Sequence, residues 1–286
     1  MTMAFTAHRP LTDRLLTIWG VLVFIYLFLP IIVIVAYSFN NGTVLANFDE
    51  FGFRAYTSGL SNDTIVNSVI TSLQAAVGSS LVATFFGTLG GVALARAKSG
   101  VWWAVGLTVV LGITLFTPEI VDGIAFLPWF VTLGVDWGLT PFNSGMVRLI
   151  ISHAMFSMAV VTFIVRARLA GMNRQLEEAS ADLGATSWAT FRSVTLPIAA
   201  PGIFAGALMA FTLSLDNTIL SSFVQLPGST PWPVYIFSAV KVALRPEVAA
   251  ISTLMFVLTL IALAICALAL RRSGGSSTEI IKTMAG

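Results

Sequence analysis

The sequence predicts an all-α, polytopic membrane protein with six transmembrane helices. Of its 286 residues, 57% are hydrophobic and 10% are charged, whereas soluble domains average roughly 45–50% and 25%. The mean hydropathy is +0.91. The apolar residues form runs of about 20, which is the length of α-helix that crosses a bilayer. Together these observations exclude a soluble globular domain.

Six apolar runs are the expected spans. In chain order they are Leu15–Phe39, Ile65–Ala95, Val101–Thr117, Met146–Val165, Ile198–Phe223 and Val248–Leu270. The second run is longer than a bilayer requires, so we expect it to tilt or to project beyond the membrane. The predicted organisation is a cytosolic tail at residues 1–14, a membrane domain at 15–270 and a second cytosolic tail at 271–286.

The segment between the third and fourth runs is too apolar for a plain loop. Residues 118–145 contain Pro118, Pro128 and Pro141, and proline interrupts the hydrogen bonding of a helix interior. We expect this segment to continue the third helix and then to form a short helix or a re-entrant turn at the outer surface.

Lysine and arginine residues indicate the side of the membrane that each polar segment occupies. If the N-terminus is inside, eleven of the 15 lie in cytosolic segments and four lie in outer segments, namely Arg54, Arg148, Lys241 and Arg245. Positive residues accumulate on the cytosolic side of a membrane. The bias predicts that both termini are cytosolic and that the polar segment at about residues 166–197 faces the cytosol.

Several function classes are excluded by what the sequence lacks. A net charge of +2 does not indicate nucleic-acid binding, and the single cysteine, Cys266, has no partner for a disulfide. No G-x-x-x-x-G-K-[ST] phosphate-binding loop occurs, so we expect no cofactor on this chain. Two histidines do not suffice for a metal site. No nucleophile and base are paired among the spans, which argues against a membrane enzyme.

The polar segment 166–197 is predicted to form a helix, a turn and a second helix. Asn173 is placed to cap the first helix, Gly184 permits the left-handed backbone of a turn, and Ser187 is placed to cap the second helix. We expect the second helix to end near Thr195 and Pro197 to open the fifth span. On this pattern alone, an amphipathic connector on the membrane surface is an equally good interpretation.

The spacing within this segment resembles a known motif. Glu178-Ala179-Ser180, Gly184 and Val194-Thr195-Leu196-Pro197 are similar to the E-A-A-x3-G-x9-I-x-L-P loop of permease subunits in binding-protein-dependent, ATP-driven importers. Ser180 replaces an alanine and Val194 an isoleucine. The resemblance implies the type I ABC importer permease fold, in which this loop contacts the ATPase. The residues that it places in the contact are Glu178, Ala179, Ser180, Asp182, Gly184, Ala185, Leu196 and Pro197.

The same resemblance implies partners and a location. ATP and Mg²⁺ bind to a separate ATPase, present as a dimer, and this chain needs no cofactor of its own. A second, related permease subunit, an extracytoplasmic solute-binding protein and the lipid bilayer complete the expected partners, with no nucleic acid among them. The expected location is the bacterial plasma (inner) membrane, with several passes of the chain.

Other segments resemble the spermidine/putrescine permeases in particular, which implies a polyamine cargo. The resemblance extends from Tyr37 to about Leu260, and its clearest segments are Tyr37–Asn40, Pro118–Val121, Phe211–Asn217, Ser222–Val224, Val240–Val242 and Pro246–Val248. That family commonly has a second acid after Asp216, where this chain has Asn217. Importers of another cationic amine, an opine or ferric iron remain alternatives.

Acidic side chains within the apolar segments indicate where a cation would pass. Charges at membrane depth are costly and usually line an aqueous pathway or pair with another group. Glu119 and Asp216 each lie 18 residues beyond the start of a predicted span (119 − 101 and 216 − 198), so both are expected toward the outer side. Carboxylates beside aromatic rings suit a diammonium cation. The candidate pathway therefore comprises Glu119, Asp122, Phe126, Trp129, Asp216 and Asn217.

Two other interpretations of these acids are open. In the first, they cap helices at the outer surface or pair with Lys241 or Arg245. In the second, they are the proton or sodium sites of an ion-coupled secondary transporter, which needs no ATPase. His153, in the fourth run, is expected to hydrogen-bond between helices rather than to bind a metal.

Overall fold

The computed structural model describes residues 10–45, 47–98 and 100–272, so residues 1–9 and 273–286, most of the two predicted tails, lie outside the described residues. The described chain is helical, with one isolated antiparallel bridge between Asn40 and Phe51. It divides into two compact units. Unit 1 comprises Met1–Asn62 and Ala243–Phe256, and unit 2 comprises Asp63–Val242 and Val257–Gly286.

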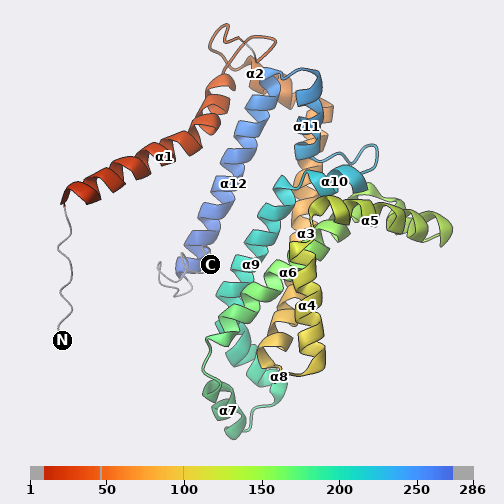
Figure 1. Cartoon of the computed structure of the whole chain (residues 1–286). Coiled ribbons are helices and arrows are strands. Elements are labelled where there is room, and N and C mark those ends of the chain that lie inside the picture. The colour runs from red at the N-terminus through yellow and green to blue at the C-terminus, as the bar shows by residue number, and fades with distance from the viewer. Residues whose placement is uncertain (1–9, 46, 99, 273–286) are drawn as a thin grey trace. The chain divides into compact units, whose positions relative to one another are not determined.

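Unit 1 contains α1 (Pro10–Tyr37), α2 (Arg54–Leu60) and the first part of α12 (Pro246–Arg272). The helix α1 bends along its length in Figure 1. Pro30 lies within this helix, and a proline there removes one backbone hydrogen bond. Helix α2 lies close to the start of α12: the Ser58 hydroxyl donates to Glu247 Oε1 at 3.2 Å.

The loop between α1 and α2 is folded around a buried amide. Asn40 is fully buried. Its Nδ2 donates to the carbonyl of Asn47 at 2.7 Å, and its Oδ1 accepts from the backbone of Gly42 and Asp49 at 3.0 Å each. Buried polar groups require such partners, so Asn40 determines the shape of this loop.

The core of unit 2 consists of α3 (Asp63–Arg96), α6 (Gly145–Ala170) and α9 (Leu196–Asp216), which pack along one another. Gly87 and Gly91 of α3 face Val161 and Val165 of α6. A methyl group at either glycine would approach the valine Cβ to 2.6 or 2.7 Å. The two helix backbones can therefore approach closely at these glycines, as small residues allow.

Helix α4 (Trp102–Phe116) does not continue into α5 (Glu119–Val131), so the prediction of a continued third helix is wrong. The chain bends by 106° between the two helices. Thr117 has an extended backbone (φ −70°, ψ 129°), because a residue before proline disfavours the helical conformation. After Pro118, α5 runs into a π-helical turn, η1 (Thr132–Asp136), and a short 3-10 helix, η2 (Thr140–Asn143), precedes α6.

Five helices of the described residues are long and apolar enough to cross a membrane, and the number is six if the bent pair α4 and α5 counts as one span. The predicted six spans correspond to the higher of these two numbers. The fifth span ends at Asp216 rather than at the predicted Phe223. The chain leaves the helical conformation at Asn217 (φ −66°, ψ 106°) and forms two further helices, α10 (Ile219–Val224) and α11 (Trp232–Val242).

Candidate docking loop and acidic pathway

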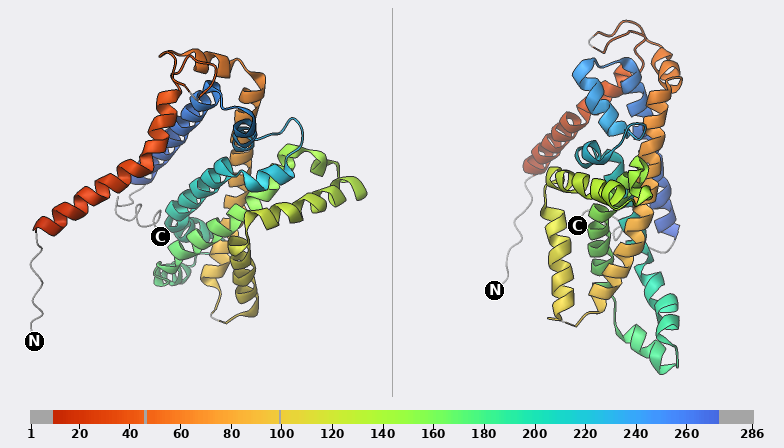
Figure 2. Two further views of the ribbon diagram at one scale, coloured as in Figure 1. Left: turned by 45° about the horizontal axis from the view of Figure 1, so that its top comes forward. Right: turned by 90° about the vertical axis from the view of Figure 1, so that its right-hand side faces the viewer.

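The segment between α6 and α9 folds as a helical hairpin, which we call the docking hairpin (residues 175–190). It consists of α7 (Gln175–Asp182) and α8 (Ser187–Thr190). Figures 1 and 2 show it at the end of unit 2 that is far from α10 and α11. The hairpin is thus a separate projection beyond the core helices.

Local hydrogen bonds determine the hairpin, and two of the three predicted signals are confirmed. Asn173 Oδ1 accepts from the backbone of Gln175 at 3.0 Å, and Gly184 adopts φ +84°. The predicted cap at Ser187 is wrong by one residue. Thr186 has the extended backbone of an N-cap, and its hydroxyl accepts from the Ala189 N–H at 3.3 Å, whereas Ser187 is already helical.

Pro197 lies in the first turn of α9, as predicted, but α9 does not start after a break in the chain. Helix α8 runs through a π-helical turn, η3 (Phe191–Thr195), into α9, so that Ser187–Asp216 is one continuous helix. In the wider turn, the N–H of Leu196 bonds to the carbonyl of Phe191. A π-turn inside an α-helix shifts the hydrogen-bond register, and here it lies immediately before the proline that lacks an N–H.

The structure brings six of the eight predicted docking residues together on the hairpin. Glu178, Ala179 and Asp182 are exposed on α7, Ser180 and Ala185 are half-buried, and Gly184 forms the turn. Leu196 and Pro197 lie instead on the body of the long helix, past the π-turn. Two large apolar side chains add to the exposed surface: Leu183 is 89% exposed and Trp188 is 69% exposed.

One ion pair at the base of the hairpin was missed by sequence reasoning. Arg96, the last residue of α3, pairs with Glu177 of α7. Arg96 Nη2 also donates to the Thr195 hydroxyl at 2.6 Å. A pocket of about 350 Å³ lies beside these three side chains, with Ala181, Ala185, Ser187, Thr190 and Phe191 in its wall. In the sequence, this ion pair is indicated only by the second acid, Glu177, next to Glu178 of the motif.

The predicted acids lie at two helix breaks that the fold brings together. Glu119 and Asp122 are in the first turn of α5, and Asp216 is the last residue of α9. The charge of Glu119 interacts with those of both Asp216 and Asp122. Among the described residues, no cation forms an ion pair with these three carboxylates, and Lys241 lies over the Phe237 ring at 4.4 Å. Pairing with Lys241 is therefore not observed.

The position of each acid within its helix shows whether the acid can stabilise that helix. The positive end of a helix macrodipole favours acids in the first turn, and the negative end disfavours them in the last. Glu119 and Asp122 are thus well placed to stabilise α5. Asp216 is at the unfavourable end of α9 and its side chain is exposed, so helix stabilisation does not explain it.

The two predicted aromatic residues belong to a cluster on α5. The Phe126 ring lies 6.1 Å from Trp129 and 5.8 Å from Phe130, centre to centre, and Phe130 is fully buried. Trp129 also contacts Phe142 of η2 at 6.1 Å. Phe126 is therefore half-buried against the core, while Trp129 remains 43% exposed.

His153 of α6 hydrogen-bonds to residues on both sides of the helix break after Asp216. It is 2% exposed, and its Nδ1 lies 2.7 Å from the Ser214 hydroxyl and its Nε2 2.8 Å from the Ser221 hydroxyl. Asn217 is also buried, and its Oδ1 accepts from the Ser221 N–H at 3.1 Å. The expectation that His153 hydrogen-bonds between helices is confirmed. Asn217 bonds to the first turn of α10 rather than facing an open space.

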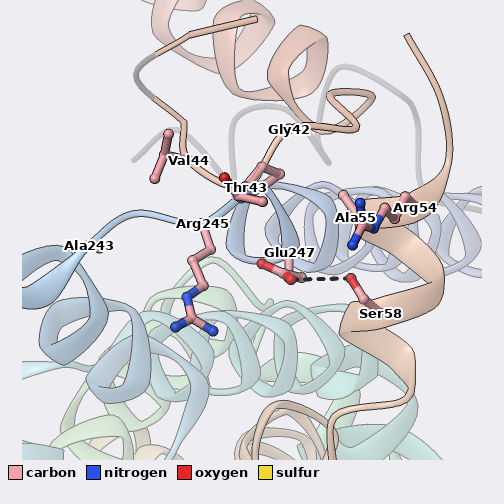
Figure 3. A pocket seen from close by; sticks show the side chains of 10 residues that line it. Gly42, Thr43, Val44, Arg54, Ala55, Ser58, Ala243, Arg245 and Glu247 are labelled. Atoms are coloured by element: carbon pink, nitrogen blue, oxygen red, sulfur yellow. Dashed lines mark hydrogen bonds between the residues drawn. The ribbon is translucent and has the colours of Figure 1, made fainter. Parts of the chain in front are cut away.

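Unit 1 contains a charged pocket of about 410 Å³ between the α1–α2 loop and the start of α12. Arg54, Arg245 and Glu247 contribute its charges, and the Glu247–Ser58 hydrogen bond lies in its wall (Figure 3). Glu247 Oε2 is buried without a hydrogen-bond partner among the described residues. Such an oxygen is costly to leave unpaired, which marks the pocket as a candidate contact site.

These features define a polytopic, helical membrane protein with a folded polar hairpin projecting from its core. The chain belongs to the family of binding-protein-dependent transport system inner membrane components, whose sequence model matches residues 87–273. It is therefore a membrane component of a transport system and not an enzyme. The family that the motif indicated is confirmed.

Curated relatives cover most of the chain. The putrescine transport system permease protein PotI of Escherichia coli (strain K12) is 34% identical over 234 residues, which are 81% of this chain and 82% of that protein. The spermidine/putrescine transport system permease protein PotC of the same strain is 35% identical over 240 residues, 84% of this chain and 87% of that protein.

Solved structures share the fold. One chain of a bacterial ABC transporter that imports the acidic polysaccharide alginate has a TM-score of 0.71 at 17% identity, covering 92% of this chain and 95% of that chain. A chain of the inward-facing MetNI methionine ABC transporter has a TM-score of 0.54 at 19% identity, covering 74% of this chain and 96% of that chain. The fold is therefore that of the type I ABC importer permeases, as predicted.

Proposed function

We propose that this chain is a permease subunit of an ATP-driven polyamine importer and forms part of the path by which spermidine or putrescine crosses the membrane. Relatives named for putrescine and for spermidine/putrescine transport match more than four fifths of the chain. The observation in this chain that carries the cargo assignment is the convergence of Glu119, Asp122 and Asp216 at two helix breaks.

The electrostatics of this cluster favour a cationic cargo. Like charges held at close range repel each other, and the repulsion increases where water is excluded. A diammonium or triammonium ion between the carboxylates removes that repulsion and gains attraction from each. Asp216 is the strongest candidate for cargo contact because it is exposed and its position on α9 serves no helix-stabilising purpose.

We propose further that the docking hairpin binds the ATPase. Its exposed face combines the acids Glu178 and Asp182 with the apolar side chains Leu183 and Trp188. Exposed apolar residues next to charges are typical of a protein contact. ATP-driven closure of two ATPase subunits would draw the hairpins of a permease pair together, and the pair would alternate between outward-open and inward-open forms.

The opposite side of the membrane would receive the solute-binding protein. The charge distribution of the polar segments supports an orientation with the N-terminus and the docking hairpin in the cytosol and residues 38–62 and 225–247 outside. The pocket with Arg54, Arg245 and Glu247 then opens to the outer side, where it offers charges of both signs to a docked protein.

Transport by the reconstituted complex tests the proposal. The permease pair, the ATPase and the binding protein are placed in liposomes and given labelled putrescine, spermidine or a neutral sugar. We expect ATP-dependent accumulation of a polyamine and none of the sugar. Accumulation that continues without ATP would indicate an ion-coupled carrier instead, and accumulation of a non-polyamine solute alone would refute the cargo.

A separate test addresses the docking hairpin. Glu178→Lys reverses a charge on an exposed side chain of α7, where a longer side chain has room. We expect the ATPase to be lost from the purified complex. Normal co-purification and normal uptake with this variant would remove the docking assignment but leave the family and fold unchanged.

A further inference from the structure

The carboxylate of Glu177 lies where three helical segments meet. Arg96 at the end of α3 donates to it through Nη2 and, at 3.3 Å, through Nε. The Thr195 hydroxyl, at the end of η3, donates to Glu177 Oε1 and accepts from Arg96 Nη2 at 2.6 Å. We call this closed set of contacts the Arg96–Glu177–Thr195 junction.

A second contact joins the same two elements. Arg174, just before α7, donates from Nη2 to the carbonyl oxygen of Ala95 at 3.1 Å. The last carbonyls of a helix have no partners within it and carry the negative end of its macrodipole. A guanidinium is therefore a favourable partner for the end of α3, and α7 is attached there at two points, one turn apart.

The burial of the junction determines how strongly it can hold α7 against the end of α3. Thr195 is fully buried, and the side chains of Glu177 and Arg96 are 21% and 37% exposed. Open surface ion pairs contribute little, whereas hydrogen bonds to charged groups that are partly shielded contribute more. The junction is thus a partly shielded contact with a specific geometry and not a mobile surface pair.

The chain connectivity shows why this contact matters. The hairpin is covalently continuous with α6 on one side and with α9 on the other. Helix α3 packs along both of them, but it has no covalent link to the hairpin. The hydrogen bonds that join the end of α3 to α7 and to the residue just before it run through Arg96, Glu177 and Arg174.

We propose that the Arg96–Glu177–Thr195 junction couples the docking hairpin to α3, so that a movement of the hairpin moves all three core helices together. The inference rests on the proposed function of the hairpin. Neighbouring acids then have opposite roles: Glu178 is exposed toward the ATPase, and Glu177 is turned inward to α3. Arg96, Glu177 and Thr195 are positioning residues that contact neither ATP nor cargo.

Charge exchange tests the coupling in the whole importer. Arg96→Glu and Glu177→Arg each place two like charges at the junction, and the double variant restores an opposite pair. We expect each single variant to keep the ATPase bound but to transport about three- to tenfold less polyamine per ATP hydrolysed. The double variant should recover most of this ratio, which a purely structural loss would not.

Two matched controls accompany the exchange. Lys98→Glu makes the same charge change two residues from Arg96, on an exposed side chain, and should leave the ratio unchanged. Thr195→Ser keeps the hydroxyl and should behave as wild type, whereas Thr195→Val removes it at nearly constant volume and should lower the ratio.

The possible outcomes distinguish this inference from the proposed function. If the wild-type complex neither binds the ATPase nor transports a polyamine, the proposed function fails. If the wild type transports normally but Arg96→Glu and Glu177→Arg retain the wild-type ratio, or the double variant does not recover, the junction has no coupling role. Loss of the ATPase in the single variants, at normal protein level, would also overturn the coupling role, because the junction would then serve docking itself.

Discussion

The hydroxyl of Ser180 lies 3.0 Å from the hydroxyl of Thr190, and this hydrogen bond joins the two helices of the docking hairpin. Ser180 occupies the second alanine position of the E-A-A motif. The departure from the motif therefore adds a contact that alanine cannot make. It links residues on either side of the turn at Gly184 and stabilises the hairpin in the absence of a partner.

Replacing Ser180 by alanine should loosen the hairpin without preventing docking. One part-buried hydrogen bond contributes about 0.5–1.5 kcal/mol, so amide hydrogen exchange in residues 175–190 should accelerate severalfold. Ser193→Ala, on an exposed serine of η3, is the control and should not change it. Equal exchange in both variants would show that the Ser180–Thr190 bond does not hold the hairpin.

Gly184→Val should disrupt the hairpin and reduce ATPase co-purification, whereas Gly184→Asn should be tolerated better. The reason is the backbone and not the space, because φ is +84° and nothing lies within 4 Å of the position that a Cβ would take. Left-handed conformations cost most L-residues about 1–2 kcal/mol, and asparagine less. Gly171→Ala, at a glycine with φ −82°, is the control. The two Gly184 variants should differ in the amount of ATPase recovered. Equal recovery would show that backbone strain at residue 184 is not the cause.

His153→Leu should destabilise the protein by about 1–3 kcal/mol, because the buried Ser214 and Ser221 hydroxyls lose a shared partner. Thermal unfolding in detergent measures the loss. Combining His153→Leu with Ser214→Ala should cost less than the sum of the single changes, since the two residues are in contact. Strict additivity would mean that their hydrogen bond contributes nothing to stability.

Asp216→Asn should lower polyamine uptake severalfold to about a hundredfold, as the loss of a charged contact worth about 1–3 kcal/mol implies. Protein level and ATPase co-purification should remain normal, which separates a pathway defect from misfolding. Asp136→Asn makes the same change at an exposed acid of η1 and should leave polyamine uptake unchanged. Wild-type uptake by the Asp216 variant would exclude this carboxylate from the cargo path.

Cysteine labelling should establish the orientation of the chain in a background with Cys266 replaced by alanine. Asn143 and Ser187 are both exposed, so accessibility within the fold does not limit labelling. An impermeant thiol reagent added outside should react with Asn143→Cys and not with Ser187→Cys. The reverse result would place the docking hairpin outside and contradict its ATPase contact.

The sequence by itself determined the class of protein and the path of the chain. The hydropathy of each span and the turn at Gly184 are properties of a short stretch of residues, because burial in lipid depends on local composition and φ > 0 depends on the residue type. These predictions needed no knowledge of which helices become neighbours.

Local sequence was not sufficient to predict helix boundaries where two alternatives differed by one residue or one turn. Thr186 and Ser187 are both capable caps, and the choice depended on where the helix begins. Pro197 lies in the first turn of α9, as expected, but the sequence did not indicate the π-turn that joins α9 to α8 without a break. The bend of 106° at Thr117–Pro118 was likewise open, since proline breaks a helix without setting the direction of the next one.

Only the tertiary structure decided which distant residues meet. Arg96 reaches Glu177 and Thr195, and His153 reaches Ser214 and Ser221, across gaps that no sequence pattern spans. Glu119 and Asp216 are near each other because two helices break at the same place in the fold. Such contacts follow from how α3, α6 and α9 pack, and packing depends on the shapes of whole helix faces rather than on the residues that finally bond.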